Sequence, residues 1–159
     1  MTENRTTFSQ VVETRCFFDA TADRIWRVLT QFDAYRYWNP FIEQVCGPLA
    51  QGEVMQLSLK SRWGWHVRLK AVVVGLEPHA RIEWMGSKFS PSLLLIEHRL
   101  KVVRNAEGAG AEVIHSERVS GLLLPLFRWA IKRDLQAGFA NMNASFKSRL
   151  GIKAERWKP

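Results

Sequence analysis

The C-terminal third of the chain carries apolar residues at steps of three and four over about 25 residues, a spacing that predicts one long amphipathic helix. We expect most of this stripe in the core; it consists of Phe127, Ile131, Leu135, Phe139, Met142, Phe146 and Leu150. Pro125 suits a first helical turn, and Gly151 suits the stop after the last turn. Gly138 interrupts the middle of the stripe, so we expect a kink or a close backbone approach there.

The residues before this helix are predicted to form short strands with one helical interruption. Residues 11–20 alternate as a half-buried strand does, and "TADRIWRVLTQF" then has helical spacing, with Thr21 as the N-cap. Six further strand candidates follow: "FIEQVC", "VMQLSLKSR", "WHVRLKAVVVGLE", "RIEWMG", "LLLIEHRLKVV" and "AEVIHSERVS". Turn residues separate them, as in "EPHAR", "GSKFSPS" and "NAEGAG". This order predicts an α+β domain in which an antiparallel sheet curves around the long helix.

The length and the polar start of the chain predict a single cytoplasmic domain. A chain of 159 residues is too short for two ordinary domains, and it contains neither a secretory signal nor a long apolar run. We therefore expect one domain over 1–159 with its core over about 11–150. Cys16 and Cys46 lack zinc-like spacing and are predicted to be reduced thiols. The four histidines lack the close spacing of metal ligands, and no nucleotide-binding loop occurs, so we expect neither metal nor cofactor.

The formal net charge of +8 raises two kinds of anionic partner, a nucleic acid and a membrane surface. The cations are spread along the chain, and neither an RNA-binding signature nor zinc-finger spacing accompanies them. The sequence thus argues against nucleic acid. An anionic membrane surface stays open as a partner, and the oligomeric state stays undecided.

Several segments have the order and spacing of a known family. They are "IWRVLTQFDAYRYWNPFI", "RIEWMG", "EHRLKVV", "HSERVSGLLLPL" and "GFANMNASFKSRL", and together they span about Val11 to Leu150. This pattern resembles the START-like or SRPBCC superfamily of polyketide cyclases, lipid-transfer proteins and birch-pollen-allergen relatives. The resemblance implies a helix-grip fold, in which a curved seven-stranded antiparallel sheet surrounds the C-terminal helix, with two short helices after strand 1. It also implies a deep hydrophobic ligand cavity, but no catalytic residue, because members share no catalytic constellation.

The last two strand candidates bring polar residues onto apolar faces. If the turn between them pairs Val102 with Val113, His98 lies opposite Glu117, because antiparallel partners keep a constant index sum. His115 shares the face of Glu117. A buried imidazole beside a carboxylate can grip a ligand hydroxyl or transfer a proton. Three interpretations stay open for this trio: a ligand contact, a purely structural hydrogen-bonded pair, and acid/base catalysis.

Aromatic residues are the other predicted ligand contacts. Trp63 and Trp65 share the parity of the neighbouring apolar strand positions, which predicts a wall at the cavity mouth, a membrane-touching tip or a plug at the sheet end. Trp38 belongs to "YRYWNPF", for which hinge packing is the alternative. Phe89 is a candidate gate residue or an isolated exposed aromatic. The full predicted set is His98, His115, Glu117, Trp38, Trp63, Trp65, Trp84, Phe89, Phe139 and Met142.

The sequence favours a protein that binds or carries a small hydrophobic ligand of lipid, polyketide or aromatic type between the sheet and the C-terminal helix. One alternative is a cyclase or dehydratase that uses the same His and Glu side chains as acid and base. The other is a lipid shuttle that docks on membranes.

Overall fold

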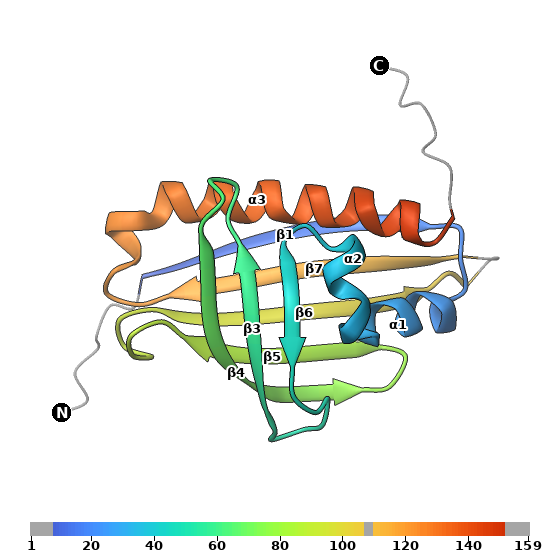
Figure 1. Ribbon diagram of the computed structural model, residues 1–159, viewed down its shortest axis with the longest axis horizontal. Helices are drawn as coiled ribbons and strands as arrows, with labels where there is room; N and C mark the ends of the chain where they lie inside the picture. Colours follow the sequence, from blue (N-terminus) through green and yellow to red (C-terminus); the bar gives the residue numbers. More distant parts are fainter. Residues whose placement is uncertain (1–7, 107–109, 152–159) are drawn as a thin grey trace, which may run out of the picture.

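The computed structural model describes residues 8–106 and 110–151. Its elements are β1 Ser9–Phe18, α1 Ala22–Thr30, the 3₁₀ turn η1 Phe32–Ala34, α2 Tyr35–Trp38, β2 Ile42–Cys46, β3 Val54–Lys60, β4 His66–Glu77, β5 Arg81–Ser87, β6 Leu95–Arg104, β7 Ala111–Ser120 and α3 Leu124–Arg149. The strands form one antiparallel sheet in the order β1-β7-β6-β5-β4-β3-β2, which curves around α3 (Figure 1). The predicted helix-grip fold is confirmed. The expected turn at 105–110 includes residues 107–109, which lie outside the described residues.

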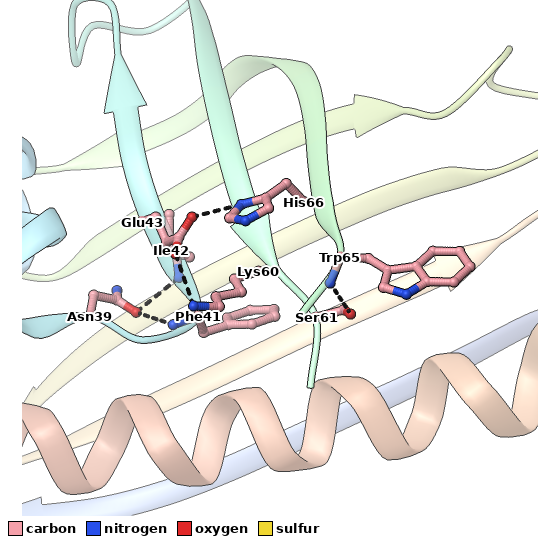
Figure 2. Close-up of polar contacts among 8 residues, drawn as sticks. All are labelled: Asn39, Phe41, Ile42, Glu43, Lys60, Ser61, Trp65 and His66. Atoms are coloured by element: carbon pink, nitrogen blue, oxygen red, sulfur yellow. Dashed lines mark hydrogen bonds and ion pairs between the residues drawn. The ribbon is translucent and has the colours of Figure 1, made fainter. Parts of the chain in front are cut away.

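Two local signals shape the segment between β1 and β2. The Thr21 hydroxyl accepts a hydrogen bond from the Arg24 amide at 3.3 Å, so the predicted N-cap of α1 is confirmed. α2 ends at Trp38 because Asn39, which precedes Pro40, adopts an extended conformation. The Asn39 side-chain oxygen then accepts the amides of Phe41 and Ile42 at 3.0 and 2.9 Å, as Figure 2 shows. The start of β2 is thereby fixed to the end of α2.

The long helix α3 carries most of the predicted apolar stripe into the core. Leu135, Phe139, Met142 and Phe146 are buried against the concave face of the sheet, and Pro125 lies in the first turn as expected. Phe127 was predicted in the core, and this prediction is wrong, since the side chain is 51% exposed. Residues 125–130 are all exposed, because the first turns of α3 extend past the part of the sheet that buries the rest of the helix.

Gly138 marks the close approach that its position in the helix suggested. A Cβ atom at this residue would lie only 2.5 to 2.9 Å from three ring carbons of Phe41. Such distances lie below ordinary van der Waals contact, so a larger residue here would displace the phenyl ring. The absence of a side chain at Gly138 lets Phe41 insert between β2 and α3.

Candidate functional site

Three buried polar side chains lie together on the concave face of the sheet. The register pairs His98 of β6 with Glu117 of β7 and Leu100 with His115, so the pairing predicted from strand alternation is confirmed. The His98 Nδ1 atom lies 3.0 Å from Glu117 Oε2, within hydrogen-bond distance. All three side chains are buried. The sheet thus holds a carboxylate and two imidazoles in a largely apolar interior.

Aromatic rings fix both imidazoles in place. Trp84, the β5 partner of His98, stacks on the His98 ring with centroids 4.2 Å apart and planes 10° from parallel. Phe139 of α3 stacks on His115 at 3.7 Å. The two imidazoles meet edge to face at 4.6 Å. Because each ring is packed on a neighbour, the orientation of its nitrogen atoms is set by the fold.

Three ring nitrogens of this cluster have no protein hydrogen-bond partner. Within residues 8–106 and 110–151, His98 Nε2 and both His115 nitrogens are buried and unpaired. A buried polar atom without a partner costs about 1–3 kcal/mol, and most such atoms in proteins are paired. The fold therefore keeps hydrogen-bonding capacity available inside an apolar space.

Burial lowers the pKa of His115 well below its ordinary value of 6.5, and the neighbouring His98 lowers it further. His115 is therefore uncharged at neutral pH. A neutral imidazole has one N–H donor and one acceptor nitrogen, so the ring can bind either a hydroxyl or a carbonyl group.

His115 should make the protein less stable in mild acid. In the unfolded chain this histidine takes up a proton below its ordinary pKa of 6.5, whereas the folded protein, in which the pKa is lowered, does not. The unfolded state then binds more protons, so lowering the pH from about 7.5 to about 5.5 should reduce the free energy of unfolding by roughly 1.4 kcal/mol through this residue. Urea unfolding of wild type and His115→Gln at both pH values measures the difference. An equal acid sensitivity of the two proteins would contradict the assignment.

The interior space beside the cluster is small in this conformation. A cavity of about 10 Å³, room for one water molecule at most, is lined by Phe41, Ile42, Leu57, Leu59, Leu69, Trp84, Gly86, Ile96, His98 and Glu117. Apart from His98 and Glu117, the residues that line this cavity are apolar or aromatic. The conformation described here is thus closed around the polar cluster.

A larger groove lies on the outside of Phe41. It has a volume of about 450 Å³, and its lining includes Arg36, Asn39, Pro40, Lys60, Gly138 and Asn141. Pro40 precedes Phe41 in the chain, and Gly138 is the residue against which the Phe41 ring packs. The ring of Phe41 therefore lines the interior cavity and packs on Gly138, a residue of the groove lining.

A comparison with known families matches residues 9–147 to the family described as polyketide cyclase / dehydrase and lipid transport. The chain belongs to this family. No curated protein matches the sequence. The shared fold extends to solved structures of low sequence identity.

Three of these structures illustrate the range of the fold. The Zhui aromatase/cyclase from Streptomyces sp. R1128 has a TM-score of 0.73 at 13% identity, covering 94% of this chain and 98% of its own. A START superfamily protein from Mycobacterium smegmatis has a TM-score of 0.69 at 17% identity, covering 89% and 97%. Truncated norcoclaurine synthase from Thalictrum flavum has a TM-score of 0.68 at 12% identity, covering 94% and 97%.

The other predicted contacts of this polyketide cyclase/dehydrase family member lie in the outer groove, in the core and on the surface. Trp38 is half-buried, packs between Tyr35 and Phe146, and lines the outer groove. Met142 is buried in the core. Trp63 and Trp65 belong to the turn between β3 and β4, and both are exposed rather than part of the cavity wall.

Phe89 is exposed and does not line the interior cavity. It lies in the loop between β5 and β6 with a positive φ of 69°, and its side chain is 77% exposed. A positive φ is uncommon for a residue other than glycine, so the loop holds this ring outward at some conformational cost.

The sequence placed Phe41 among the aromatic residues of "YRYWNPF" but did not include it in the predicted ligand contacts. Phe41 follows Pro40 in an aromatic-rich segment, and nothing in its spacing distinguishes it from a packing residue. Gly138 predicted that another residue approaches α3 closely, but the sequence did not show that this residue is Phe41. The cations of the groove, Arg36, Lys60 and Arg62, were missed as well, because they come from separate segments of the chain.

Proposed function

We propose that this chain binds a small, largely apolar molecule that carries a hydroxyl or carbonyl group, in the space between the sheet and α3. The observation that supports it is the set of three unpaired nitrogens of two packed imidazoles: His98 lines a small, mostly apolar cavity, and His115 packs on His98. Ligand pockets of this kind are mostly apolar and contain a few polar groups that orient the ligand. A bound hydroxyl or carbonyl would pair nitrogens that the protein leaves without partners.

The chemistry of the trio suits the recognition of a neutral oxygen. His115 is uncharged at neutral pH and offers one donor and one acceptor. His98 uses Nδ1 toward Glu117, so its Nε2 is left for the ligand. Trp84, whose indole lines the cavity, favours an aromatic or other planar ligand over a bulky one.

Admission of such a ligand requires Phe41 to leave its present position. The closed cavity has room for one water at most, whereas the groove outside Phe41 is large enough for a small molecule. The ligand would collect in the groove and pass inward when the ring turns away from Gly138. Because only the open fraction of the protein binds, the apparent affinity is weakened in proportion to that fraction.

Native mass spectrometry of the purified protein tests the proposal. We expect a bound compound that is released on unfolding and that competes with anilinonaphthalene sulfonate, a fluorescent apolar probe. His115→Leu should weaken probe displacement by that compound about tenfold, the scale of one lost hydrogen bond to a ligand in a closed site. His79→Leu, which changes an exposed histidine beside α1, is the matched control. A wild-type protein that binds neither a compound nor the probe would overturn the proposal.

A second function is supported by the His98–Glu117 pair itself. An imidazole held 3.0 Å from a carboxylate, with its second nitrogen free, is an arrangement for taking a proton from carbon and returning it to a departing hydroxyl. The family description includes cyclases and dehydrases. A poly-β-ketone thioester incubated with the protein separates the two functions: conversion that Glu117→Gln abolishes indicates an enzyme, and binding without conversion indicates a carrier.

A further inference from the structure

Seven of the exposed large apolar side chains belong to three segments at one end of the molecule. Three segments contribute them: the β3–β4 turn at 61–65, the β5–β6 loop at 88–94, and residues 121–133 around the start of α3. We call these three segments together the aromatic end. Its exposed apolar side chains are Trp63, Trp65, Phe89, Leu122, Leu126, Phe127 and Trp129. Exposed apolar side chains are ordinary when scattered, but a concentration at one end indicates a contact surface.

Hydrogen bonds hold the three segments together. The amides of Leu122 and Leu123 donate to the carbonyls of Ser92 and Leu93, which joins the β5–β6 loop to the start of α3. The Arg62 amide donates to Asp134 Oδ1 at 2.7 Å, which joins the β3–β4 turn to α3. In Figure 1 the loop and the start of α3 lie at the left edge, and the turn crosses the N-terminal half of α3. Hydrogen bonds thus fix the three segments of the aromatic end relative to one another.

The direction of Trp65 supports this grouping. In Figure 2 its indole points away from Asn39. Asn39 lies on the side of Gly138, since both line the groove. The indole therefore points toward the half of α3 that begins at Leu124.

Cations accompany the exposed rings. The three segments contain the five basic residues Arg62, Lys88, Arg128, Lys132 and Arg133, and no aspartate or glutamate. The Arg133 guanidinium lies 4.5 Å from the Trp129 ring centre, the Arg62 guanidinium lies 4.8 Å from that of Trp63, and the Lys88 ammonium lies 5.7 Å from that of Phe89. Each pair presents an apolar ring beside a positive charge.

We propose that the aromatic end docks on the surface of a bilayer that contains anionic phospholipid. Indole rings prefer the boundary between headgroups and acyl chains, and Lys and Arg beside them bind anionic headgroups. The exposed leucines, Leu122 and Leu126, find apolar surroundings in a bilayer but not on nucleic acid, which pairs with cations and stacks on rings. A second copy of this chain is a poor partner, because five cations would face five cations. No helix in the described ranges is long and apolar enough to cross a membrane, so the contact is with the surface.

Cosedimentation with vesicles tests this docking. We expect binding to vesicles of phosphatidylcholine mixed with phosphatidylserine, weaker binding to phosphatidylcholine alone, and loss of binding as salt is raised. Trp65→Ser and Trp129→Ser should each weaken it about tenfold, the scale of partly burying one large apolar side chain. Lys132→Glu should weaken it at least about fivefold through the lost cation.

Two matched controls distinguish docking from a general effect of exposed residues. Tyr37 is 76% exposed, as Trp65 is, but belongs to α2 and not to the three segments of the aromatic end, so Tyr37→Ser should leave binding unchanged. Arg27→Glu reverses an exposed charge on α1 and should reduce binding less than Lys132→Glu. Equal effects of Tyr37→Ser and Trp65→Ser, or equal binding to both vesicle types, would overturn the proposal. So would a protein that ignores vesicles but binds a single-stranded oligonucleotide through Trp65 and Trp129. None of these outcomes depends on the interior cavity.

Discussion

Replacing Phe41 by alanine should join the outer groove to the interior cavity. The ring lines the cavity and packs on Gly138, so its removal leaves a space that the rigid sheet and α3 do not fill. We expect the free energy of unfolding to fall by about 3–5 kcal/mol, the usual effect of truncating a buried phenylalanine. We also expect anilinonaphthalene sulfonate to bind about tenfold more tightly, because the closed fraction no longer competes with binding. Urea unfolding and probe titration measure the two effects.

Phe139→Ala is the matched control for this result. Phe139 is equally buried and also adjoins the polar cluster, but it belongs to the inner face of α3. Its truncation should destabilise the protein by a similar amount and enlarge the cavity without joining it to the groove. The probe should therefore associate faster with Phe41→Ala than with Phe139→Ala. Equal association rates in stopped-flow measurements would show that Phe41 does not close the passage.

Removing one partner of the His98–Glu117 pair should destabilise the protein far more than removing both. Glu117→Leu leaves a buried imidazole without its carboxylate and should lower the free energy of unfolding by about 3 kcal/mol. His98→Leu leaves the buried carboxylate without its imidazole and should lower it by a similar amount. The double variant should lie within roughly 1 kcal/mol of wild type, because two apolar side chains replace a polar pair of similar volume. Urea unfolding of the four proteins completes the cycle.

The exposed pair of Arg15 and Glu13, at 2.9 Å, provides the comparison. Glu13→Ala should change stability by less than about 1 kcal/mol, since solvent screens an exposed pair. If the effects of the two buried substitutions simply add, the two side chains are not coupled, and each stabilises the fold independently. If the double variant is as stable as wild type but no longer displays ligand-dependent probe displacement, the pair is present for the ligand.

Strand alternation was sufficient to predict the polar cluster, because side chains in a strand alternate strictly and antiparallel pairing conserves the index sum. His98 opposite Glu117 followed from these two rules and one assumed turn. The same alternation failed for Trp63 and Trp65. They lie in a turn with Gly64 at a φ of 82°, where the strand period no longer applies.

Helical spacing was informative about α3 but not about how far the sheet covers it. The period places Phe127 on the same stripe as Phe139, yet only the latter is buried. Coverage depends on where the sheet ends in space, which the period does not contain. The closing of the cavity by Phe41 was also out of reach, because it arises from a contact between β2 and α3 that is distant in the chain.

The hydrogen bonds on both sides of Phe41 restrict the shape of a ligand that can pass its ring. The amide of Phe41 is bound by Asn39, and its carbonyl accepts the Lys60 amide at 2.8 Å, so the backbone is anchored at this residue. The passage then widens by rotation of one side chain and not by movement of a loop. An opening of that kind is about as thick as one aromatic ring. It would select molecules by thickness more than by length, admitting a flat ring system or a single acyl chain ahead of a branched one.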